Sequence, residues 1–458
     1  MASASNSLTV HCQALFLAGP ASGQGKTTVT AALSRALRNL GKVVHVFKTG
    51  PDYLDPQVLA QASGHSVEQL DIWMAGEPYC KQRIYDAAKV ADYILVEGAM
   101  GLFDGEPSSA DLAACFGIPI AIVMDVKGMA QTTAAIVSGL ANHRDDIQVR
   151  GLIANNCGSE RHAELIRDAL LDSTPLLATL KRDESIALPE RHLGLVQASE
   201  ATDVLEERFE AGAEALIQGT QGIENLQAMF SQVSFASPQI PEHILPTTLK
   251  GKTIAIAKDE AFSFIYQANL DLLETLGASY QFFSPIHDSA MPEADALWLP
   301  GGYPELHAKS LSLNTKMLKS IAIFFAMDRP VLAECGGFLY CLESLTDLND
   351  ECYPMLSLLK GHGAMRGKRG CQGMQTAVLP EGELRGHAHH RSRSFDTDEP
   401  FSHARRQRHP APGEALYRSK GLTASYLHFF FPNNPDAIAQ IFSQEWHQKV
   451  AEELAYVS

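Results

Sequence analysis

The stretch that decides the fold of the first half of the chain is Leu15–Thr28, LFLAGPASGQGKTT. An apolar segment runs into a glycine-rich turn and continues as an amphipathic segment to Leu40, which predicts a strand, a loop and a helix. Backbone N–H groups around Gly23 and Gly25 would surround an anion, and the start of the helix would add its positive end. The pattern therefore predicts a phosphate-binding loop and an ATP site.

Three side chains follow the glycines of this loop. Lys26 would carry a mobile positive charge to the outer phosphates, Thr27 would bind Mg²⁺ through its hydroxyl, and Thr28 is a further candidate ATP contact. The spacing departs from the common G-x-x-x-x-G-K-[ST] form, because Pro20 stands at the first glycine position and Gly19 comes one residue earlier. This spacing resembles the dethiobiotin-synthetase branch of phosphate-loop folds.

Length and charge limit the classes of protein to consider. At 458 residues the chain is too long for one hydrophobic core. A formal charge of −16 argues against a nucleic-acid partner, and no apolar run reaches the length of about 18 residues that a membrane span requires. The N-terminus shows no export signal, so we expect a cytoplasmic protein. The eight cysteines show no paired C-x-x-C spacing, which indicates neither a zinc site nor a disulfide framework.

Acidic side chains follow two further predicted strands of the first half. Asp52 and Asp55 come after the strand of residues 42–50, in which Lys48 would reach a phosphate, and Glu97 ends the next strand, with Asp104 in the loop beyond. The C-terminal ends of parallel strands gather ligands at one edge. We expect Asp52 and Glu97 to bind Mg²⁺ with the loop threonine, and Asp55 and Asp104 to act in catalysis. Turn formation and capping are the alternatives.

Later segments of this half offer contacts to the base and to the substrate. Asn155, at the end of a predicted strand, is placed to bind the adenine edge, although a helix cap is nearly as good an interpretation. Arg191 and His192 lie in a loop where a cation would meet an acidic substrate, with a solvated loop as the alternative. Strands and helices alternate throughout, which predicts an α/β fold with a parallel sheet covered on both faces.

A proline-rich segment separates the two halves. From about residue 218 the strand pattern is lost, and Pro238, Pro241 and Pro246 interrupt any regular element. From residue 253 the alternation of strand and helix resumes. We therefore predict two domains, of residues 1–235 and 236–458.

The centre of the second half is the segment RPVLAECGGFLYCLESL, residues 329–345. A predicted strand ends at Glu334, the chain turns at Cys335, and a helix follows the two glycines, which is the pattern of a nucleophile elbow. We expect the start of the helix to stabilise the thiolate, so that Cys335 is a catalytic nucleophile. A buried structural cysteine is the alternative.

A base and an oxyanion hole are also indicated in this half. His428, after a short apolar segment, would pair with the cysteine, or would be a core histidine. The backbone N–H groups of Gly301, Gly302 and Gly336 would stabilise a tetrahedral intermediate. No acid is apparent as a third member of a triad.

The segment 383–395, ELRGHAHHRSRSF, is locally cationic in an acidic protein. We expect Arg385, His387 and His390 to form a cluster that binds a polycarboxylate, with a solvated loop as the alternative. Adjacent histidines on an extended chain point to opposite faces and make poor common metal ligands. Residues 397–416 are interpreted as a flexible insertion.

With these motifs in hand, the chain resembles the cobyrinic acid (hydrogenobyrinic acid) a,c-diamide synthase family over nearly its whole length. The resemblance rests on segments in the order and spacing of that family, namely GPASGQGKTT, FKTGPDYLDP, VEGAMGLFDG, LPERHLGL, AFSFIYQANL, LWLPGGYPE, AECGGFLY and ASYLHF. Two positions depart from it, since Phe430 stands where a second histidine is often found and Ala388 where a glutamate is.

The resemblance implies a dethiobiotin-synthetase-like domain followed by a class I glutamine amidotransferase domain. It also implies ATP- and Mg²⁺-dependent amidation of the a and c acetates of a corrin polycarboxylate, with ammonia from glutamine. The implied partners are these small molecules, and a homodimer is left open. Amidation of nickel sirohydrochlorin or another tetrapyrrole is one alternative. A switch ATPase or scaffold with a degenerate second module is the other.

Overall fold

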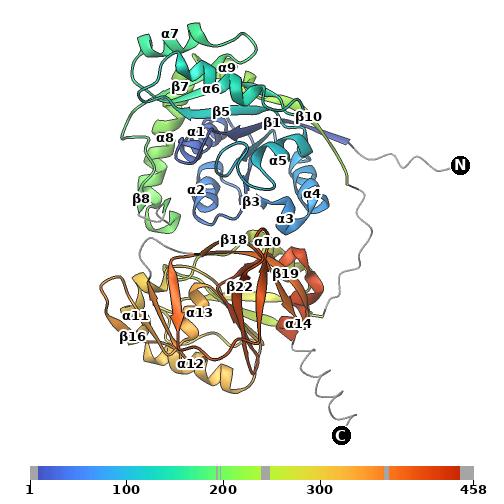
Figure 1. Cartoon of the computed structure of the whole chain (residues 1–458), viewed down its shortest axis with the longest axis vertical. Helices are drawn as coiled ribbons and strands as arrows, with labels where there is room; N and C mark the ends of the chain where they lie inside the picture. The colour runs from blue at the N-terminus through green and yellow to red at the C-terminus, as the bar shows by residue number, and fades with distance from the viewer. Residues whose placement is uncertain (1–8, 192–193, 196, 239–247, 366–370, 444–458) are drawn as a thin grey trace, which may run out of the picture. The chain divides into compact units, whose positions relative to one another are not determined.

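The computed structural model describes residues 9–191, 194–195, 197–238, 248–365 and 371–443 (Figure 1). Contacts between Cα atoms divide the chain into two compact units, Met1–Pro241 and Glu242–Ser458. The boundary expected between residues 235 and 236 falls inside a strand, β10 (Ser231–Ala236), that pairs with the first strand of the chain. We therefore propose that the first domain includes all of β10.

A mainly parallel sheet forms the centre of the first unit. Its eight strands include β10 antiparallel to β1, and the remaining order is β3 (Glu68–Leu70), β2 (Val44–Thr49), β4 (Tyr93–Glu97), β1 (Thr9–Ala18), β5 (Ile120–Asp125), β6 (Val149–Cys157) and β7 (Leu176–Lys181). A two-stranded sheet joins β8 (Glu190–Arg191) to β9 (Gly194–Leu195). The neighbouring strands from β3 to β7 are parallel, so their C-terminal ends share one edge.

Both faces of this sheet are buried under helices, and successive side chains of a strand point to opposite faces. Leu15 and Leu17 of β1 pack in one apolar core, and Phe16 packs in the other. The first core lies under α1 (Lys26–Asn39), α2 (Leu54–Ser63), α8 (Thr202–Gly219) and α9 (Ile223–Ala228). The second lies under α4 (Glu77–Ala88), α5 (Ser109–Phe116), α6 (Thr132–Ala141) and α7 (Glu160–Ala169), and the short α3 is Ile72–Ala75.

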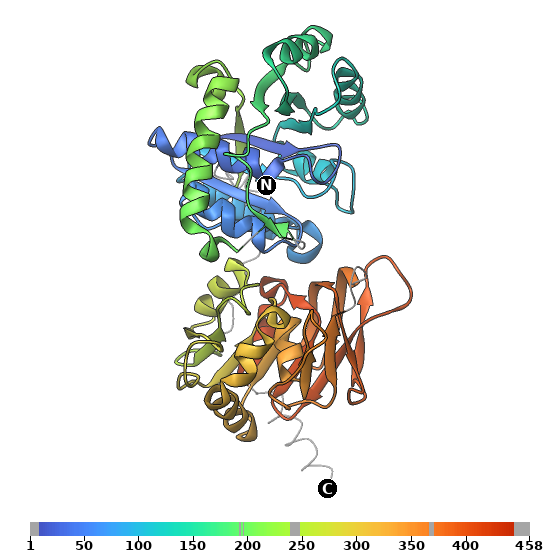
Figure 2. The same cartoon turned by 90° about the vertical axis from the view of Figure 1, so that its left-hand side faces the viewer.

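The second unit is built on a ten-stranded mixed sheet. Its order is β12 (Ser279–Phe283), β11 (Thr253–Ala257), β13 (Ala296–Leu299), β14 (Val331–Glu334), β23 (Leu422–Ser425), β22 (Pro412–Ser419), β21 (Ser402–Arg406), β18 (Cys371–Leu379), β19 (Gly382–His390) and β24 (His428–Phe429). A smaller sheet joins β16 (Cys352–Pro354), β15 (Ser344–Thr346), β17 (His362–Met365) and β20 (Ser392–Phe395). The antiparallel strands appear in orange in Figure 2.

Helices cover both faces of this second sheet too. One apolar core includes side chains of α11 (Ala308–Leu313), α12 (Thr315–Ala326) and α13 (Gly336–Cys341). The other includes side chains of α10 (Gln267–Thr275) and α14 (Pro435–Ser443). The predicted α/β class, with two α/β domains in sequence, is confirmed.

Two parts of the sequence-based organisation are wrong. The segment after residue 218 does contain a strand, since β10 pairs with β1 from Thr9↔Ala236 to Ala14↔Ser231. The segment interpreted as a flexible insertion forms β21, the loop after it and the first part of β22, and these two strands lie inside the sheet between β18 and β23. Among the described helices, none has the length and apolar character needed to cross a membrane.

Candidate functional sites

The glycine-rich loop lies between β1 and α1, as the sequence pattern predicts. Gly25 caps α1 with a φ of 85°, in the left-handed region that favours glycine. A Cβ atom on Gly25 would lie 2.1 Å from Nδ2 of Asn155, so the position also lacks room for a side chain. Loop and helix start therefore present backbone N–H groups at the C-terminal edge of the sheet, where phosphates bind in folds of this kind.

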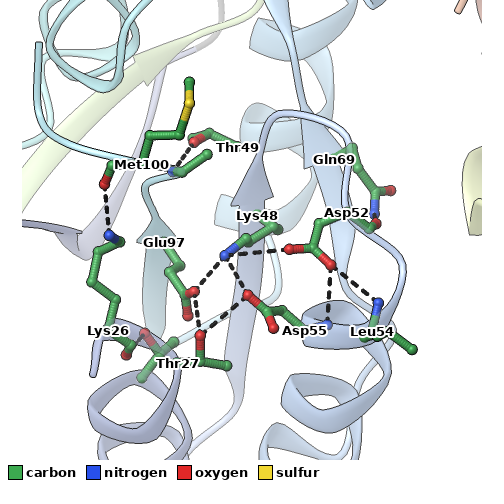
Figure 3. Close-up of polar contacts among 12 residues, drawn as sticks. Lys26, Thr27, Lys48, Thr49, Asp52, Leu54, Asp55, Gln69, Glu97 and Met100 are labelled. Carbon is green, nitrogen blue, oxygen red and sulfur yellow. Dashed lines mark hydrogen bonds and ion pairs between the residues drawn. The ribbon is translucent and has the colours of Figure 1, made fainter. Parts of the chain in front are cut away.

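Lys26 extends across this loop. It is 7% exposed, and its ammonium donates hydrogen bonds to the carbonyl oxygens of Ala21, at 3.0 Å, and Met100, at 2.6 Å. Burial, followed by the neighbouring charge of Lys48, lowers the pKa of Lys26. The loop of β1 and the loop after β4 are thus joined through one cation (Figure 3).

A buried charge cluster lies beside the loop and contains Thr27, Lys48, Asp55 and Glu97 (Figure 3). The hydroxyl oxygen of Thr27 lies 2.9 Å from Oε1 of Glu97 and 3.2 Å from Oδ2 of Asp55, so its one hydrogen can be donated to either carboxylate. The ammonium of Lys48 contacts the same two carboxylates, at 2.5 Å to Glu97 and 2.7 Å to Asp55. Four groups from the ends of two strands, β2 and β4, and from the starts of two helices, α1 and α2, therefore converge at one edge of the parallel sheet.

The charges of this cluster stabilise one another. Burial would lower the pKa of Lys48, but Asp55 and Glu97 outweigh it and hold that pKa well above its ordinary value. Burial would raise the pKa of Asp55, but Lys48 outweighs it and the pKa is lowered. Lysine and aspartate are therefore charged at neutral pH.

Asp52, a predicted metal ligand, contacts the start of α2 rather than the hydroxyl of Thr27. Its Oδ1 accepts the backbone N–H groups of Leu54, at 3.1 Å, and Asp55, at 3.2 Å, at the start of α2. Its Oδ2 lies 3.8 Å from Lys48, and burial raises its pKa to about 7. The hydroxyl of Thr27 hydrogen-bonds to Asp55. Asp55, rather than Asp52, therefore lies next to Thr27, which is itself a predicted metal ligand.

The residues of the cluster fit Mg²⁺. The Oε2 atom of Glu97 is buried and forms no hydrogen bond to any described residue, and Glu97 lies beside the hydroxyl of Thr27. A carboxylate oxygen and a threonine hydroxyl are ligands that Mg²⁺ takes next to a phosphate loop. Such a cation would satisfy the buried oxygen.

The other predicted residues of the first unit are placed as follows. Asn155 donates to the carbonyl oxygen of Gln24, at 3.1 Å, so its amide holds the phosphate loop. Asp104 is exposed in the loop after β4 and accepts the N–H of Gly101, at 3.0 Å. Thr28 lies in the first turn of α1 and Arg191 in β8, whereas His192 lies outside the described residues.

In the second unit, Cys335 stands between β14 and α13 with a φ of 47°. This left-handed conformation is uncommon for a residue with a side chain and is typical of a nucleophile elbow. Its N–H donates to the carbonyl oxygen of Ser425, at 2.8 Å, and the N–H of Gly337 donates to that of Pro300, at 3.0 Å. The turn is therefore fixed from both sides.

The surroundings of Cys335 oppose the thiolate that the sequence pattern predicts. Burial, followed by the carboxyl groups of Glu305 and Glu414, raises the pKa of the thiol. The side chain is 4% exposed, and the helix that follows it is only six residues long. The expected stabilisation of the thiolate by the helix start is therefore outweighed, and the group is a thiol at neutral pH.

His428 meets the glycine loop after β13. A Cβ atom on Gly301 would lie 2.2 Å from Cε1 of His428, and one on Gly336 would lie 3.0 Å from the N atom of Gly302. One loop therefore contacts both the base candidate and the residue after the nucleophile candidate. Burial lowers the pKa of His428 to about 3, so the imidazole is neutral and one of its ring nitrogens carries no proton.

Sequence reasoning missed Glu334, the residue before the nucleophile. It is 1% exposed and accepts hydrogen bonds from the indole of Trp298, at 2.9 Å, and from the N–H of Phe429, at 2.7 Å. It thus links the strand of Cys335 to that of His428. The sequence signal for Glu334 was an acidic residue that directly precedes the nucleophile candidate, whereas the search for an acid considered only the residues after His428.

The expected cationic cluster of Arg385, His387 and His390 is not one cluster. Residues three apart in a strand point to opposite faces, and the two histidines have different neighbours. His387 is buried, stacks on His428 with ring centroids 5.0 Å apart, and has a pKa held well below its ordinary value by burial and by His428. His390 stacks on Tyr426 at 3.9 Å. Arg385 is half-buried on β19.

The two halves of the chain match two family models. Residues 15–196 match the CobQ/CobB/MinD/ParA nucleotide binding domain, and residues 253–436 match the CobB/CobQ-like glutamine amidotransferase domain. The first range contains the phosphate loop and the charge cluster. The second contains Cys335 and His428.

Curated relatives match over nearly the full length of both chains. The chain is 48% identical to the hydrogenobyrinate a,c-diamide synthase of Stutzerimonas stutzeri, covering 94% of this chain and 98% of that protein. It is 45% identical to the protein of that name from Pseudomonas aeruginosa, with the same coverages. It is 43% identical to the cobyrinate a,c-diamide synthase of Herminiimonas arsenicoxydans, covering 96% and 99%.

Proposed function

Because the chain belongs to the cobyrinate and hydrogenobyrinate a,c-diamide synthase family, we propose that it amidates the a and c acetates of one of these corrin acids. It is a carbon–nitrogen ligase that uses ATP, with glutamine as the nitrogen donor. The observation that carries the proposal is the presence in one chain of a phosphate loop with a buried charge cluster, and of a cysteine elbow and a neutral histidine that both border the glycine loop after β13.

The first unit activates the substrate carboxylate. A carboxylate is a poor electrophile, so an oxygen of the acetate attacks the γ-phosphorus of ATP and ADP leaves, which gives an acyl phosphate. Lys26 and Lys48 neutralise the charge on the transferred group. Thr27, Glu97 and Asp55 would hold Mg²⁺, with Asp55 in the place expected for Asp52. The ion would supply positive charge at the phosphates.

Ammonia then completes the amide. Its lone pair attacks the acyl carbon, phosphate leaves with the bonding electrons, and a proton is lost from nitrogen. Asp104 is a candidate to orient the ammonia, Asn155 to contact the adenine, and Arg385, with Arg191, to bind substrate carboxylates. A cytoplasmic location belongs to the same proposal, and a homodimer is compatible with it.

The second unit releases the ammonia. The sulfur of Cys335 attacks the side-chain amide carbon of glutamine while its proton moves to His428, and the N–H groups of Gly301, Gly302 and Gly336 stabilise the oxyanion. The histidine then protonates the leaving nitrogen, which departs as ammonia and leaves a thioester. Water hydrolyses the thioester to glutamate. Since the thiol is protonated at rest, this proton transfer is required for attack.

The test is amidation by the purified full-length chain. Protein, ATP, Mg²⁺ and glutamine are incubated with cobyrinate, hydrogenobyrinate or nickel sirohydrochlorin, and products are identified by mass spectrometry. We expect a diamide of a corrin acid. A diamide of nickel sirohydrochlorin alone would contradict the substrate assignment, and ATP hydrolysis without any amide product would favour the switch ATPase.

A further inference from the structure

The second unit contains a group of metal-ligating side chains that the proposed reaction does not use. Within the described ranges, the ligand atoms of Cys371, His390 and Glu414 all lie within 4.8 Å of one another. They come from β18, β19 and β22, strands separated in the sequence. We propose that these three residues form a binding site for a thiophilic divalent cation of the Zn²⁺ type.

The sheet places the three ligands together. Cys371 and His390 are directly opposite one another in the antiparallel pair β18–β19, so their side chains share a face. Gln375, four residues further along β18 and on the same face, accepts the N–H of Glu414 through Oε1, at 2.7 Å. The Nε2 atom of the same side chain lies 3.9 Å from the sulfur of Cys371. One amide therefore orients two of the ligands.

The orientation of His390 is that of a metal ligand. Its Nδ1 lies 3.1 Å from the carbonyl oxygen of Ser392, so Nδ1 carries the proton and Nε2 has its lone pair turned to the other side. A ring nitrogen held in this way by a backbone carbonyl is the usual support of a histidine that binds a metal.

The other ring nitrogen of His390, Nε2, faces the carboxylate of Glu414. Nε2 of His390 is buried, forms no hydrogen bond to a described residue, and lies 3.3 Å from Oε1 of Glu414. Two lone pairs at this distance need a cation near both. Atoms that each lie about 2.0 Å from a tetrahedral ion are about 3.3 Å apart, so the observed separation fits one edge of such a site.

The ligand types select the cation. Thiolate sulfur with imidazole nitrogen favours Zn²⁺ over Mg²⁺, which prefers oxygen ligands. Three protein ligands leave a fourth position for solvent or a small ligand. The histidine and glutamate side chains are only 9% and 13% exposed, so the site is largely closed.

A proton could replace the metal. In that case His390 would be an imidazolium paired with Glu414, and Cys371 would be a thiol that donates a hydrogen bond to the same carboxylate. The two accounts differ in whether the sulfur contacts the cation, and this difference decides the choice of probe.

The experiment adds Co²⁺ to the chelator-treated full-length protein and records the thiolate-to-cobalt charge-transfer absorption. We expect the band in the wild type, its displacement by Zn²⁺ but not by Mg²⁺, and its loss in Cys371→Ser. Glu414→Gln and His390→Ala should weaken binding at least about tenfold. Zn²⁺ should also raise the melting temperature of the wild type and not that of Cys371→Ser.

Two cysteine variants serve as controls. Cys352→Ser removes an exposed thiol, and Cys335→Ala removes the nucleophile candidate, so the band should persist in both. Absence of the band in the folded wild type, or its persistence in Cys371→Ser, would overturn the proposal in favour of the imidazolium pair. This outcome is independent of corrin amidation, because no step of the assay uses ATP, glutamine or a corrin.

Discussion

The two candidate sites of this chain differ in whether their buried side chains are charged or neutral. Beside the phosphate loop, Lys48 is 4% exposed yet remains charged between Asp55 and Glu97. At the elbow, burial leaves Cys335 a thiol and His428 a neutral imidazole, with its pKa lowered to about 3. Both sites are buried, and in the first the ammonium of Lys48 lies at hydrogen-bond distance from two carboxylates.

The difference follows from the chemistry that we propose for each site. Phosphoryl transfer gains from charges that are already in place, because the phosphates are charged throughout. Thiol attack on an amide instead needs groups that start neutral and become charged as the proton moves. The predictions below test this contrast, beginning with the largest expected effect.

Removing charge from the first site should stop synthesis from any nitrogen source. Glu97→Gln keeps the shape of the side chain but removes the charge that faces Thr27 and Lys48. We expect amidation to fall at least about 1,000-fold with glutamine and with ammonium alike, since several kcal/mol of charge stabilisation are lost. The measurement is the rate of amide formation by mass spectrometry.

The matched control is Glu77→Gln, which alters an exposed carboxylate of the same unit that pairs with Lys81. This variant should keep nearly full activity. Substantial synthesis by Glu97→Gln would show that the cluster does not serve the ATP step.

Removing the base of the second site should affect only one nitrogen source. In His428→Ala the thiol has no acceptor for its proton, and burial holds its pKa high, so little thiolate is present. Glutamine-driven amidation should fall about 100-fold or more, while ammonium-driven amidation is retained. His287→Ala, at an exposed histidine of the same unit, is the control. Near-normal glutamine use by His428→Ala would exclude it as the base.

The two aspartates after β2 should differ, although the sequence treats them alike. Asp55→Asn removes a charge that contacts Thr27 and Lys48, so we expect about a 10- to 100-fold loss of synthesis with an unchanged melting temperature. Asp52→Asn should affect synthesis less, because Asp52 hydrogen-bonds to the backbone at the start of α2. Equal kinetic losses in the two variants would contradict this distinction.

A smaller effect is expected in the rates at which two thiols of the second unit are alkylated. At pH 8, alkylation of Cys335 by iodoacetamide should be at least about tenfold slower than that of the exposed Cys352, since a pKa raised by one unit already removes about nine-tenths of the thiolate. The rates are measured by mass spectrometry of peptides. Faster reaction at Cys335 than at Cys352 would mean that the thiolate is stabilised after all.

Features encoded by contiguous residues could be predicted from the sequence. The phosphate loop and the elbow each lie in one segment in which a strand, a glycine-rich turn and a helix follow one another. These patterns placed Lys26, Thr27 and Cys335 at the correct sheet edges, and the α/β class followed from the alternation of elements.

Features that depend on neighbours from distant segments could not be predicted. The sequence of β10 resembles a linker, and its pairing with the distant β1 makes it a strand. In the same way, β21 is a strand because it pairs with β18 and β22. The pKa of Cys335 depends on burial and on Glu305 and Glu414, which no local pattern reveals. The separation of His387 from His390 follows from the alternation of side chains along a strand, once residues 382–390 are known to form β19 rather than a loop.

The measurement that most directly tests the central claim, that the two sites perform separate chemistries, uses Cys335→Ala. Amidation by this variant is compared with glutamine and with ammonium salts at alkaline pH, where the free-base fraction of ammonia is higher. The account predicts no glutamine-driven product and ammonium-driven synthesis close to that of the wild type. A folded Cys335→Ala protein that still hydrolyses glutamine, or that binds ATP but makes no amide from ammonium, would contradict it.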